Sequence, residues 1–278
     1  MNIRYTQNFL KSEKLVEQIV KLGKIQPDST ILEIGSGEGI ITRELSKHGQ
    51  VVAIELDATL AKKLILPGVT VINMDILQYD LAALPAGYIV FSNVPFNITS
   101  ELLEHLLNAQ TGCKQAHLIL QEDAIKPDAQ TETFKSMMIY PLYTIEVAHR
   151  FKRSDFSPQP GVDTALFAFM RREQPLMDVA QYEIYKDFLA FISKDRVGEG
   201  VWKKLFSKNQ LERMPQLIAA RGLKSQSAEG IFQSFETFMK LNTSKLGLIE
   251  GAMNRLREEQ KRRERINQAG GYHRSQKR

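Results

Sequence analysis

The sequence has few of the features that stabilise secreted proteins or anchor membrane proteins. Cys113 is the only cysteine among 278 residues, so no intrachain disulfide can form, which is typical of a protein in a reducing cytosol. No apolar run approaches the ~20 residues that a membrane-spanning helix needs, and the first residues lack the apolar core of a secretory signal. The five histidines are scattered, without the spacing of zinc ligands. We therefore expect a cytoplasmic protein that uses neither a metal nor a membrane.

The net charge of +5 is distributed unevenly along the chain. Residues 1–170 contain 15 Lys and Arg against 19 Asp and Glu, a net charge of −4. Residues 171–250 contain 13 against 10, which gives +3, and residues 251–278 contain 9 against 3, which gives +6. An acidic first part and a basic last part predict a catalytic region followed by a region that holds a polyanion.

Short apolar runs alternate with amphipathic segments over the first half of the chain. Candidate strands are residues 30–34, 51–55, 69–73, 88–92 and 116–121, and candidate helices are residues 12–23, 40–48, 58–65 and 99–109. This alternation predicts an α/β fold with a parallel sheet covered on both faces. Residues 143–151 and 162–170 read as two further strands, which we expect as an antiparallel edge.

The pattern changes after residue 172, where strand signals become rare. Residues 178–194 and 229–241 have helical apolar spacing. We therefore predict a first domain over residues 1–172 and a helical domain over residues 173–250. Residues 251–278 form a basic tail, in which a charged helix ending near residue 268 and disorder in the last ten residues are expected.

The tetrapeptide Asn93-Val94-Pro95-Phe96 follows the candidate strand 88–92. Its residue types suit methylation of an exocyclic amino group on a planar base. The Asn93 side-chain oxygen and the Pro95 carbonyl can accept the two amine hydrogens, which frees a lone pair that is otherwise delocalised into the ring. Proline fixes φ and holds its carbonyl in place, and Phe96 can stack on the base. Taken alone, these four residues also fit a simple turn after a strand.

A glycine loop, Gly35-Ser36-Gly37-Glu38-Gly39, connects the candidate strand 30–34 to a helix. Glycines allow a sharp turn and a close approach to a ligand, although an ordinary tight turn has the same composition. Glu33 favours a cationic ligand, because S-adenosyl-L-methionine carries an ammonium and a sulfonium, whereas a carboxylate would repel the pyrophosphate of NAD. The loop therefore favours the methyl donor over a dinucleotide.

Two further acids follow the next strands. Glu55 ends the second candidate strand, where an acidic side chain would hold a ribose diol. Asp75 follows the third, where a carboxylate could accept from an adenine amino group. The alternatives are a solvated acid for Glu55 and a helix N-cap for Asp75.

Together these motifs resemble those of the rRNA adenine N6-methyltransferases, a family that includes the Erm macrolide-resistance enzymes and the KsgA-type dimethyltransferases. Two more segments share the likeness. Residues 5–10 resemble the family's Gln-Asn-Phe-Leu element, which implies that Gln7 and Asn8 contact the methionine end of the cofactor; the alternative is that they pin this segment to the sheet. Residues 156–163 resemble its Phe-x-Pro-x-Pro-x-Val-Asp segment, which implies that Phe156 lies near the target base; the alternative is a core or loop-anchoring aromatic. The motifs occur in the family's order over residues 4–172.

The resemblance implies a Rossmann-like class I S-adenosylmethionine-dependent methyltransferase sheet with a smaller C-terminal helical domain. Residues 7–15 and 203–210 look more like Erm chains, so the implied reaction is N6-methylation of adenine 2058 in 23S rRNA. The implied consequence is resistance to macrolides, lincosamides and streptogramin B.

Phe96 stands where the family mostly has Tyr. Stacking on the base does not require the hydroxyl that is lost, so we expect activity. The alternatives are a KsgA-type 16S rRNA dimethyltransferase and a non-catalytic nucleic-acid-binding protein on the same fold. A small-molecule methyltransferase would not need the basic regions.

The sequence identifies RNA-binding residues less clearly than it identifies the catalytic and cofactor motifs. Candidates are Arg4, Lys11, Lys152 and Arg153 beside the motifs, Lys203, Lys204 and Lys208 in the helical region, and Lys261, Arg262 and Arg263 in the tail. Such residues would bind phosphates, which supplies affinity without specificity; the alternatives are solvated lysines and a solvated charged helix. We expect a monomer that binds protein-free or nascent 23S rRNA.

Overall fold

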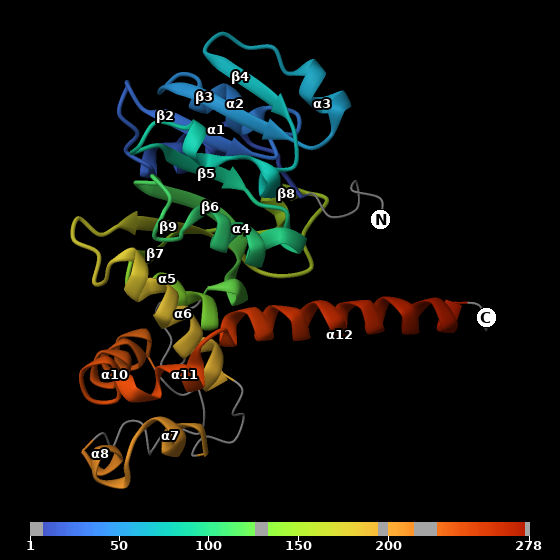
Figure 1. Ribbon diagram of the computed structural model, residues 1–278. Coiled ribbons are helices and arrows are strands. Elements are labelled where there is room, and N and C mark those ends of the chain that lie inside the picture. The colour runs from blue at the N-terminus through green and yellow to red at the C-terminus, as the bar shows by residue number, and fades with distance from the viewer. Residues whose placement is uncertain (1–7, 126–132, 194–199, 214–226, 276–278) are drawn as a thin grey trace. The chain divides into compact units, whose positions relative to one another are not determined.

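The computed structural model describes residues 8–125, 133–193, 200–213 and 227–275. The chain forms two compact units (Figure 1). The first consists of residues 1–129 and 139–176, and the second of residues 130–138 and 177–278. The first unit ends four residues after the expected boundary at residue 172, and the segment 130–138 joins the second unit, which no sequence pattern indicates.

A seven-stranded sheet with the order β4-β3-β2-β5-β6-β9-β7 forms the centre of the first unit. Its strands are β2 (Thr30–Ile34), β3 (Gln50–Glu55), β4 (Val69–Asn73), β5 (Ile89–Asn93), β6 (Gln115–Gln121), β7 (Tyr143–Arg150) and β9 (Thr164–Arg171). The strands β2 to β6 pair in parallel, whereas β9 pairs antiparallel with both β6 and β7. The predicted parallel sheet with an antiparallel edge is therefore confirmed.

Helices flank this sheet, as the alternating pattern predicts. They are α1 (Glu13–Leu22), α2 (Ile40–Leu45), α3 (Ala58–Lys63) and α4 (Thr99–Leu106), with 3-10 turns η2 (Ile76–Gln78), η3 (Leu81–Ala83), η4 (Phe96–Ile98), η5 (Glu122–Ala124) and η6 (Arg153–Asp155). Helix α1 begins where the Ser12 hydroxyl accepts a hydrogen bond from the Leu15 N–H at 3.2 Å. Its apolar stripe, Val16, Ile19 and Val20, is buried in the same cluster as Ile31 of β2.

A two-residue ribbon connects distant parts of the first unit. Strand β1 (Phe9–Leu10) pairs antiparallel with β8 (Phe156–Ser157), so that Phe9 faces Ser157 and Leu10 faces Phe156. The Lys11 N–H also donates to the Asp155 carbonyl at 3.0 Å. The ribbon therefore joins the N-terminal motif to the Phe-Ser-Pro-Gln-Pro segment, a contact that the sequence does not predict.

The second unit is helical. It contains α6 (Val179–Ser193), α7 (Gly200–Leu205), α8 (Lys208–Glu212), α10 (Ala228–Leu241), η8 (Thr243–Lys245), α11 (Leu246–Ile249) and α12 (Ala252–Ser275), and α5 (Phe134–Ile139) begins in it. Aromatic rings form its core, with Tyr185 meeting Phe235 edge-on at 5.1 Å and Phe188 meeting Phe238 at 5.5 Å. Helix α12 continues to Ser275, past the expected end near residue 268 and into the last ten residues, for which we expect disorder. Arg, Glu, Gln and Lys are strong helix formers and favour the helix up to residue 268. Gly270 and Gly271 lie in the continuation, so helix propensity does not explain why α12 extends beyond that residue.

A buried histidine lies on one of the central strands of the sheet. His117 on β6 is 3% exposed, and neither ring nitrogen has a partner among the described residues. Its ring stacks on Phe91 of β5 with centroids 5.7 Å apart. Burial lowers the pKa of His117 from 6.5 to about 4. The unfolded chain therefore binds this proton more readily than the folded chain between these two pH values.

We expect the free energy of unfolding to fall as the pH drops from 6.5 to 4, by as much as about 3 kcal/mol from His117 alone. The substitution His117→Phe keeps a ring beside Phe91 and removes the proton site, so it should flatten this pH dependence. Urea denaturation at several pH values measures it, with His149→Phe, at a half-buried histidine of the same unit, as the matched control. A variant whose stability falls as steeply as that of the wild type over this range would contradict the interpretation.

Candidate active site at the carboxyl ends of the strands

The expected site residues gather where the parallel strands end. In an open α/β sheet, ligands bind at the carboxyl edge where the strand order changes direction. Here β3 and β4 extend from one side of β2, and β5 and β6 from the other. Gly35 directly follows β2, and Asn93 is the last residue of β5. The topology therefore places the glycine loop and the Asn-Val-Pro-Phe motif on either side of the switch point.

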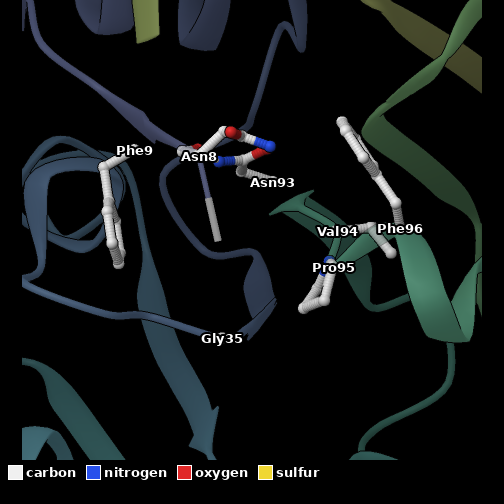
Figure 2. Close-up of a pocket in the computed structure, with 7 residues that line it drawn as sticks. All are labelled: Asn8, Phe9, Gly35, Asn93, Val94, Pro95 and Phe96. Atoms are coloured by element: carbon white, nitrogen blue, oxygen red, sulfur yellow. Dashed lines mark hydrogen bonds between the residues drawn. The ribbon is translucent and has the colours of Figure 1, made fainter. Parts of the chain in front are cut away.

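A pocket lies between these two motifs (Figure 2). It is lined by Asn8, Phe9, Gly35, Asn93, Val94, Pro95 and Phe96. The side-chain amide of Asn93 donates from Nδ2 to the backbone carbonyl of Asn8 at 2.7 Å. Because the nitrogen is held in this way, the Asn93 side-chain oxygen remains as the acceptor. That is the atom which the proposed binding of an amine requires.

The residues on either side of Asn93 are held by β2 and β6, the two strands that neighbour β5. The preceding Ser92 is fully buried, and its hydroxyl donates to the Ile34 carbonyl at the end of β2 at 2.6 Å. The following Val94 donates its N–H to the Ile119 carbonyl of β6 at 3.3 Å. Pro95 has a φ of −59°, and its carbonyl accepts from the Ile98 N–H at 3.2 Å. A carbonyl oxygen has two lone pairs, so Pro95 can accept one further hydrogen bond.

The glycine loop has little space for side chains. Gly37 has a φ of +54°, and a Cβ at this position would lie 2.8 Å from the Phe9 ring. Gly39 has a φ of +80° as the N-cap of α2, and a Cβ there would lie 2.5 Å from the Leu64 side chain. Nothing lies within 4 Å of the position of a Cβ on Gly35. Gly37 and Gly39 are therefore packed against protein side chains, whereas the open space at Gly35 would allow a ligand to approach the backbone closely.

Glu55 supports this loop from β3. It is 1% exposed, so it is not a solvated strand end. Its carboxylate accepts from the Gly37 N–H at 2.8 Å and from the Asp57 N–H at 2.9 Å. Each oxygen still has a lone pair for a ribose hydroxyl. Asp75 caps η2 by accepting from the Leu77 N–H at 3.0 Å, so its capping role is present whether or not it also binds adenine.

Glu33 is a buried acid at the end of β2. It is 1% exposed, and its Oε2 has no hydrogen-bond partner among the described residues. Burial raises the pKa of Glu33 to about 8, and the neighbouring Glu55 adds to this shift. A buried carboxylate that lacks a partner is costly unless a cation compensates it. The site therefore fits a ligand with a positive charge, as S-adenosylmethionine has.

The sequence analysis does not identify two apolar side chains that lie next to Glu55 and Asp75. Leu56 follows Glu55 and is 52% exposed, and Met74 precedes Asp75 and is 40% exposed. The Met74 N–H donates to the Glu55 carbonyl at 3.2 Å, which joins the two strand ends. Apolar side chains of this size suit the faces of a planar ring. Their positions directly beside Glu55 and Asp75 in the sequence could have identified them as candidates for contact with a planar ring.

Several expected residues lie away from the pocket or outside the described residues. Phe156 is 1% exposed and meets Phe151 edge-on at 5.3 Å in the hydrophobic core. This position favours the loop-anchoring alternative, and its contact with a base stays a prediction. Gln7 and Arg4 lie outside the residues that the structure describes.

The expected RNA contacts are almost all exposed. Those with exposed side chains are Lys11, Lys152, Arg153, Lys203, Lys204, Lys208, Lys261, Arg262 and Arg263. Arg153 pairs with Asp163 at 3.0 Å, so its guanidinium is already engaged. Over the described ranges there is no group of three or more His, Cys, Asp or Glu arranged to hold a metal ion. In the same part of the chain, no helix is both long enough and apolar enough to cross a membrane.

The sheet, the glycine loop and the acids at the ends of β2 and β3 define a class I S-adenosylmethionine-dependent methyltransferase. A sequence profile of the ribosomal RNA adenine dimethylase family matches residues 1–240. The chain therefore belongs to the ribosomal RNA adenine dimethylase family.

The relatives include both large-subunit and small-subunit enzymes. An rRNA adenine N-6-methyltransferase of Enterococcus faecalis is 28% identical over 250 residues, which cover 88% of this chain and 99% of the relative. A ribosomal RNA small subunit methyltransferase A of Streptococcus equi subsp. zooepidemicus is 30% identical over 267 residues, with 85% and 89% covered. The crystal structure of the 23S rRNA methyltransferase ErmE superimposes with a TM-score of 0.72 at 26% identity, covering 84% of this chain and 100% of that one.

These findings confirm the activity that the motifs indicate. The protein is an rRNA adenine N6-methyltransferase, its methyl donor is S-adenosylmethionine, and its substrate is an RNA. Of the residues present, Glu33, Gly35, Gly37, Gly39, Glu55 and Asp75 would hold the donor. Glu33 would contribute a negative charge, and the glycines would allow the donor to approach the backbone closely.

The substitution Glu33→Gln should have opposite effects on stability and on cofactor binding. The folded pKa of about 8 lies above the ordinary value of 4.5, so ionisation of Glu33 destabilises the cofactor-free fold increasingly as the pH rises from 4.5 to 8. The variant should therefore melt at a higher temperature than the wild type at pH 8.5, with the difference disappearing near pH 4.5. It should also bind S-adenosylmethionine at least about tenfold more weakly, because a charged partner is lost.

Scanning calorimetry and titration calorimetry measure the two effects. Glu38→Gln, at an exposed position of the same loop, is the matched control and should show neither effect. Cofactor affinity equal to that of the wild type in Glu33→Gln would remove Glu33 from the binding site.

Proposed function

We propose that the enzyme methylates N6 of adenine 2058 in 23S rRNA and thereby confers resistance to macrolides, lincosamides and streptogramin B. The observation that carries this choice of substrate is the likeness to the 23S rRNA methyltransferase ErmE over the whole length of that chain, with a TM-score of 0.72. The relative from Enterococcus faecalis, matched over 99% of its length, supports it. A methyl group at N6 would obstruct the drug site on the ribosome.

The proposed mechanism uses the fixed acceptors of the pocket. S-adenosylmethionine supplies an electrophilic methyl group when bound. The Asn93 side-chain oxygen accepts one hydrogen of the adenine amine, because its own nitrogen is held by the Asn8 carbonyl. The Pro95 carbonyl accepts the other hydrogen with its remaining lone pair. Held between two acceptors, the amine nitrogen becomes pyramidal and presents its lone pair for in-line attack. Positioning of this kind accounts for much of the rate of a bimolecular transfer.

Phe96 sets the plane of the base in this mechanism. Its ring lines the pocket beside Pro95 (Figure 2) and can stack on adenine. No strong general base is required, since the attacking lone pair is available before the proton leaves. The target adenine must leave its stack in the RNA, at a cost of roughly a few kcal/mol. We place this reaction in the cytoplasm, on protein-free or nascent rRNA, and assign it to a monomer.

The substitution Asn93→Ala should reduce methyl transfer at least about a hundredfold, because an aligned acceptor of the reacting amine is lost. Single-turnover transfer from labelled S-adenosylmethionine measures the rate, and titration calorimetry measures cofactor affinity separately. The matched control is Asn97→Ala, which changes an exposed asparagine four residues away and should leave the rate within about twofold. Near wild-type transfer by Asn93→Ala would exclude the proposed role.

The substrate is tested by offering purified protein labelled S-adenosylmethionine with protein-free 23S rRNA and, separately, with 16S rRNA and small ribosomal subunits. Label in 23S rRNA, with a primer-extension stop at adenine 2058, supports the proposal. Label in 16S rRNA alone would replace it with the small-subunit activity named for the relative at 30% identity. Mass spectrometry of the labelled nucleoside then distinguishes one added methyl group from two.

A further inference from the structure

Helix α12 lies beyond the part of the chain that the family profile matches. The profile ends at residue 240, and α12 begins at Ala252. Family membership therefore assigns no role to this helix. Its structure within the second unit has to be explained from its own contacts and charges.

The start of α12 is fixed to α6 by a single carboxylate. Asp187 of α6 accepts from the Gly251 N–H at 2.7 Å and from the Met253 N–H at 2.8 Å. Gly251 has a φ of +68°, which turns the chain into the helix. Ala252 and Met253 are 1% and 7% exposed. Asp187 thus caps the first turn with a negative charge, which also favours the helix dipole.

Beyond this anchored turn, α12 carries a dense run of exposed cations. Lys261, Arg262, Arg263 and Arg265 are all exposed. At 1.5 Å per residue, the 24-residue helix is about 36 Å long. The acids Glu258 and Glu259 precede the run, so its positive charge is concentrated about two turns from the anchor.

The arrangement of these cations selects the kind of partner. Successive residues of a helix are separated by about 100°, so positions 261, 262, 263 and 265 spread over an arc of about 200° rather than forming one narrow stripe. Between residues 257 and 266 the only apolar residue is Ile266. The segment therefore has no apolar face that a membrane or a second copy of the chain would need. Cations on several sides suit a polyanion whose charges lie on both sides of a groove.

We propose that α12 is an RNA-binding arm, in which Lys261, Arg262, Arg263 and Arg265 contact phosphates of the rRNA substrate without reading its sequence. This inference rests on the proposed function for its substrate. The arm supplies affinity and salt dependence, and Asp187 fixes its point of attachment to the second unit.

The test is a fourfold variant, K261Q/R262Q/R263Q/R265Q. Its affinity for a 23S rRNA fragment is measured at several salt concentrations by filter binding. Four lost phosphate contacts should reduce the slope of log affinity against log salt concentration by about 3. At low salt the affinity should fall at least about tenfold. A charge-preserving variant, R262K/R263K/R265K, should keep the wild-type slope.

The matched control removes the same charge from elsewhere. K14Q/K62Q/K63Q/K114Q changes four exposed lysines of the first unit, and it should alter the slope by much less than the α12 variant. Cofactor affinity and helical circular dichroism establish that each protein is folded. A wild-type slope for the fourfold α12 variant would overturn the proposal, as would an equal loss in the control. Because the slope is read from binding and the proposed function from methyl transfer by the unmodified protein, failure of one is distinguishable from failure of the other.

Discussion

The hydrogen bond from the Asn93 amide to the Asn8 carbonyl, at 2.7 Å, determines the geometry of the site. It joins the end of β5 to the N-terminal segment, and β1 in turn joins that segment to β8. One side-chain amide thus performs two tasks. Its nitrogen binds the Asn8 carbonyl in the wall of the pocket, and its oxygen is the acceptor that the proposed mechanism uses. An amide is suited to this because it has a donor and an acceptor on one rigid plane.

The two buried acids of the site, Glu55 and Glu33, differ in their hydrogen bonds. Glu55 is buried but satisfied, because two backbone N–H groups donate to it. Glu33 is buried and has an oxygen without a partner among the described residues, so burial raises its pKa. Glu55 stabilises the glycine loop through its hydrogen bond to Gly37. The Glu33 carboxylate, in contrast, would be stabilised by a bound cation. Ionisation of Glu33 lowers the stability of the cofactor-free fold, and in the proposed site the same charge would strengthen cofactor binding, a relation that is common at functional sites.

The sequence predicts well those features that depend on near neighbours. The strand at residues 30–34 and the sharp turn at Gly37 and Gly39 follow from local rules, and the structure contains both. The β1–β8 ribbon has only two residues in each strand, which is too short for any periodicity to reveal. The deep burial of Glu33, whose Oε2 has no hydrogen-bond partner in the described part of the chain, could not be predicted either, because it depends on segments that are distant in the sequence.

The same limit applies to the charged side chains. Asp187 caps a helix that starts 65 residues later in the chain, and Arg153 pairs with Asp163 across a loop. Neither pairing has a sequence signature. Phe156, by contrast, does belong to a recognisable sequence motif. The motif does not predict that its ring is buried against Phe151, because that contact depends on the surrounding core.

The pairing of Phe9 with Ser157 has a consequence for the nascent chain. Asn8 and Phe9 form one wall of the pocket, yet their strand partner is separated from them by almost the whole first unit. Closing such a long loop costs entropy that only the completed sheet can offset. The ribbon cannot form before β8 has been synthesised, so the pocket wall that contains Phe9 is fixed late in the synthesis of the first unit.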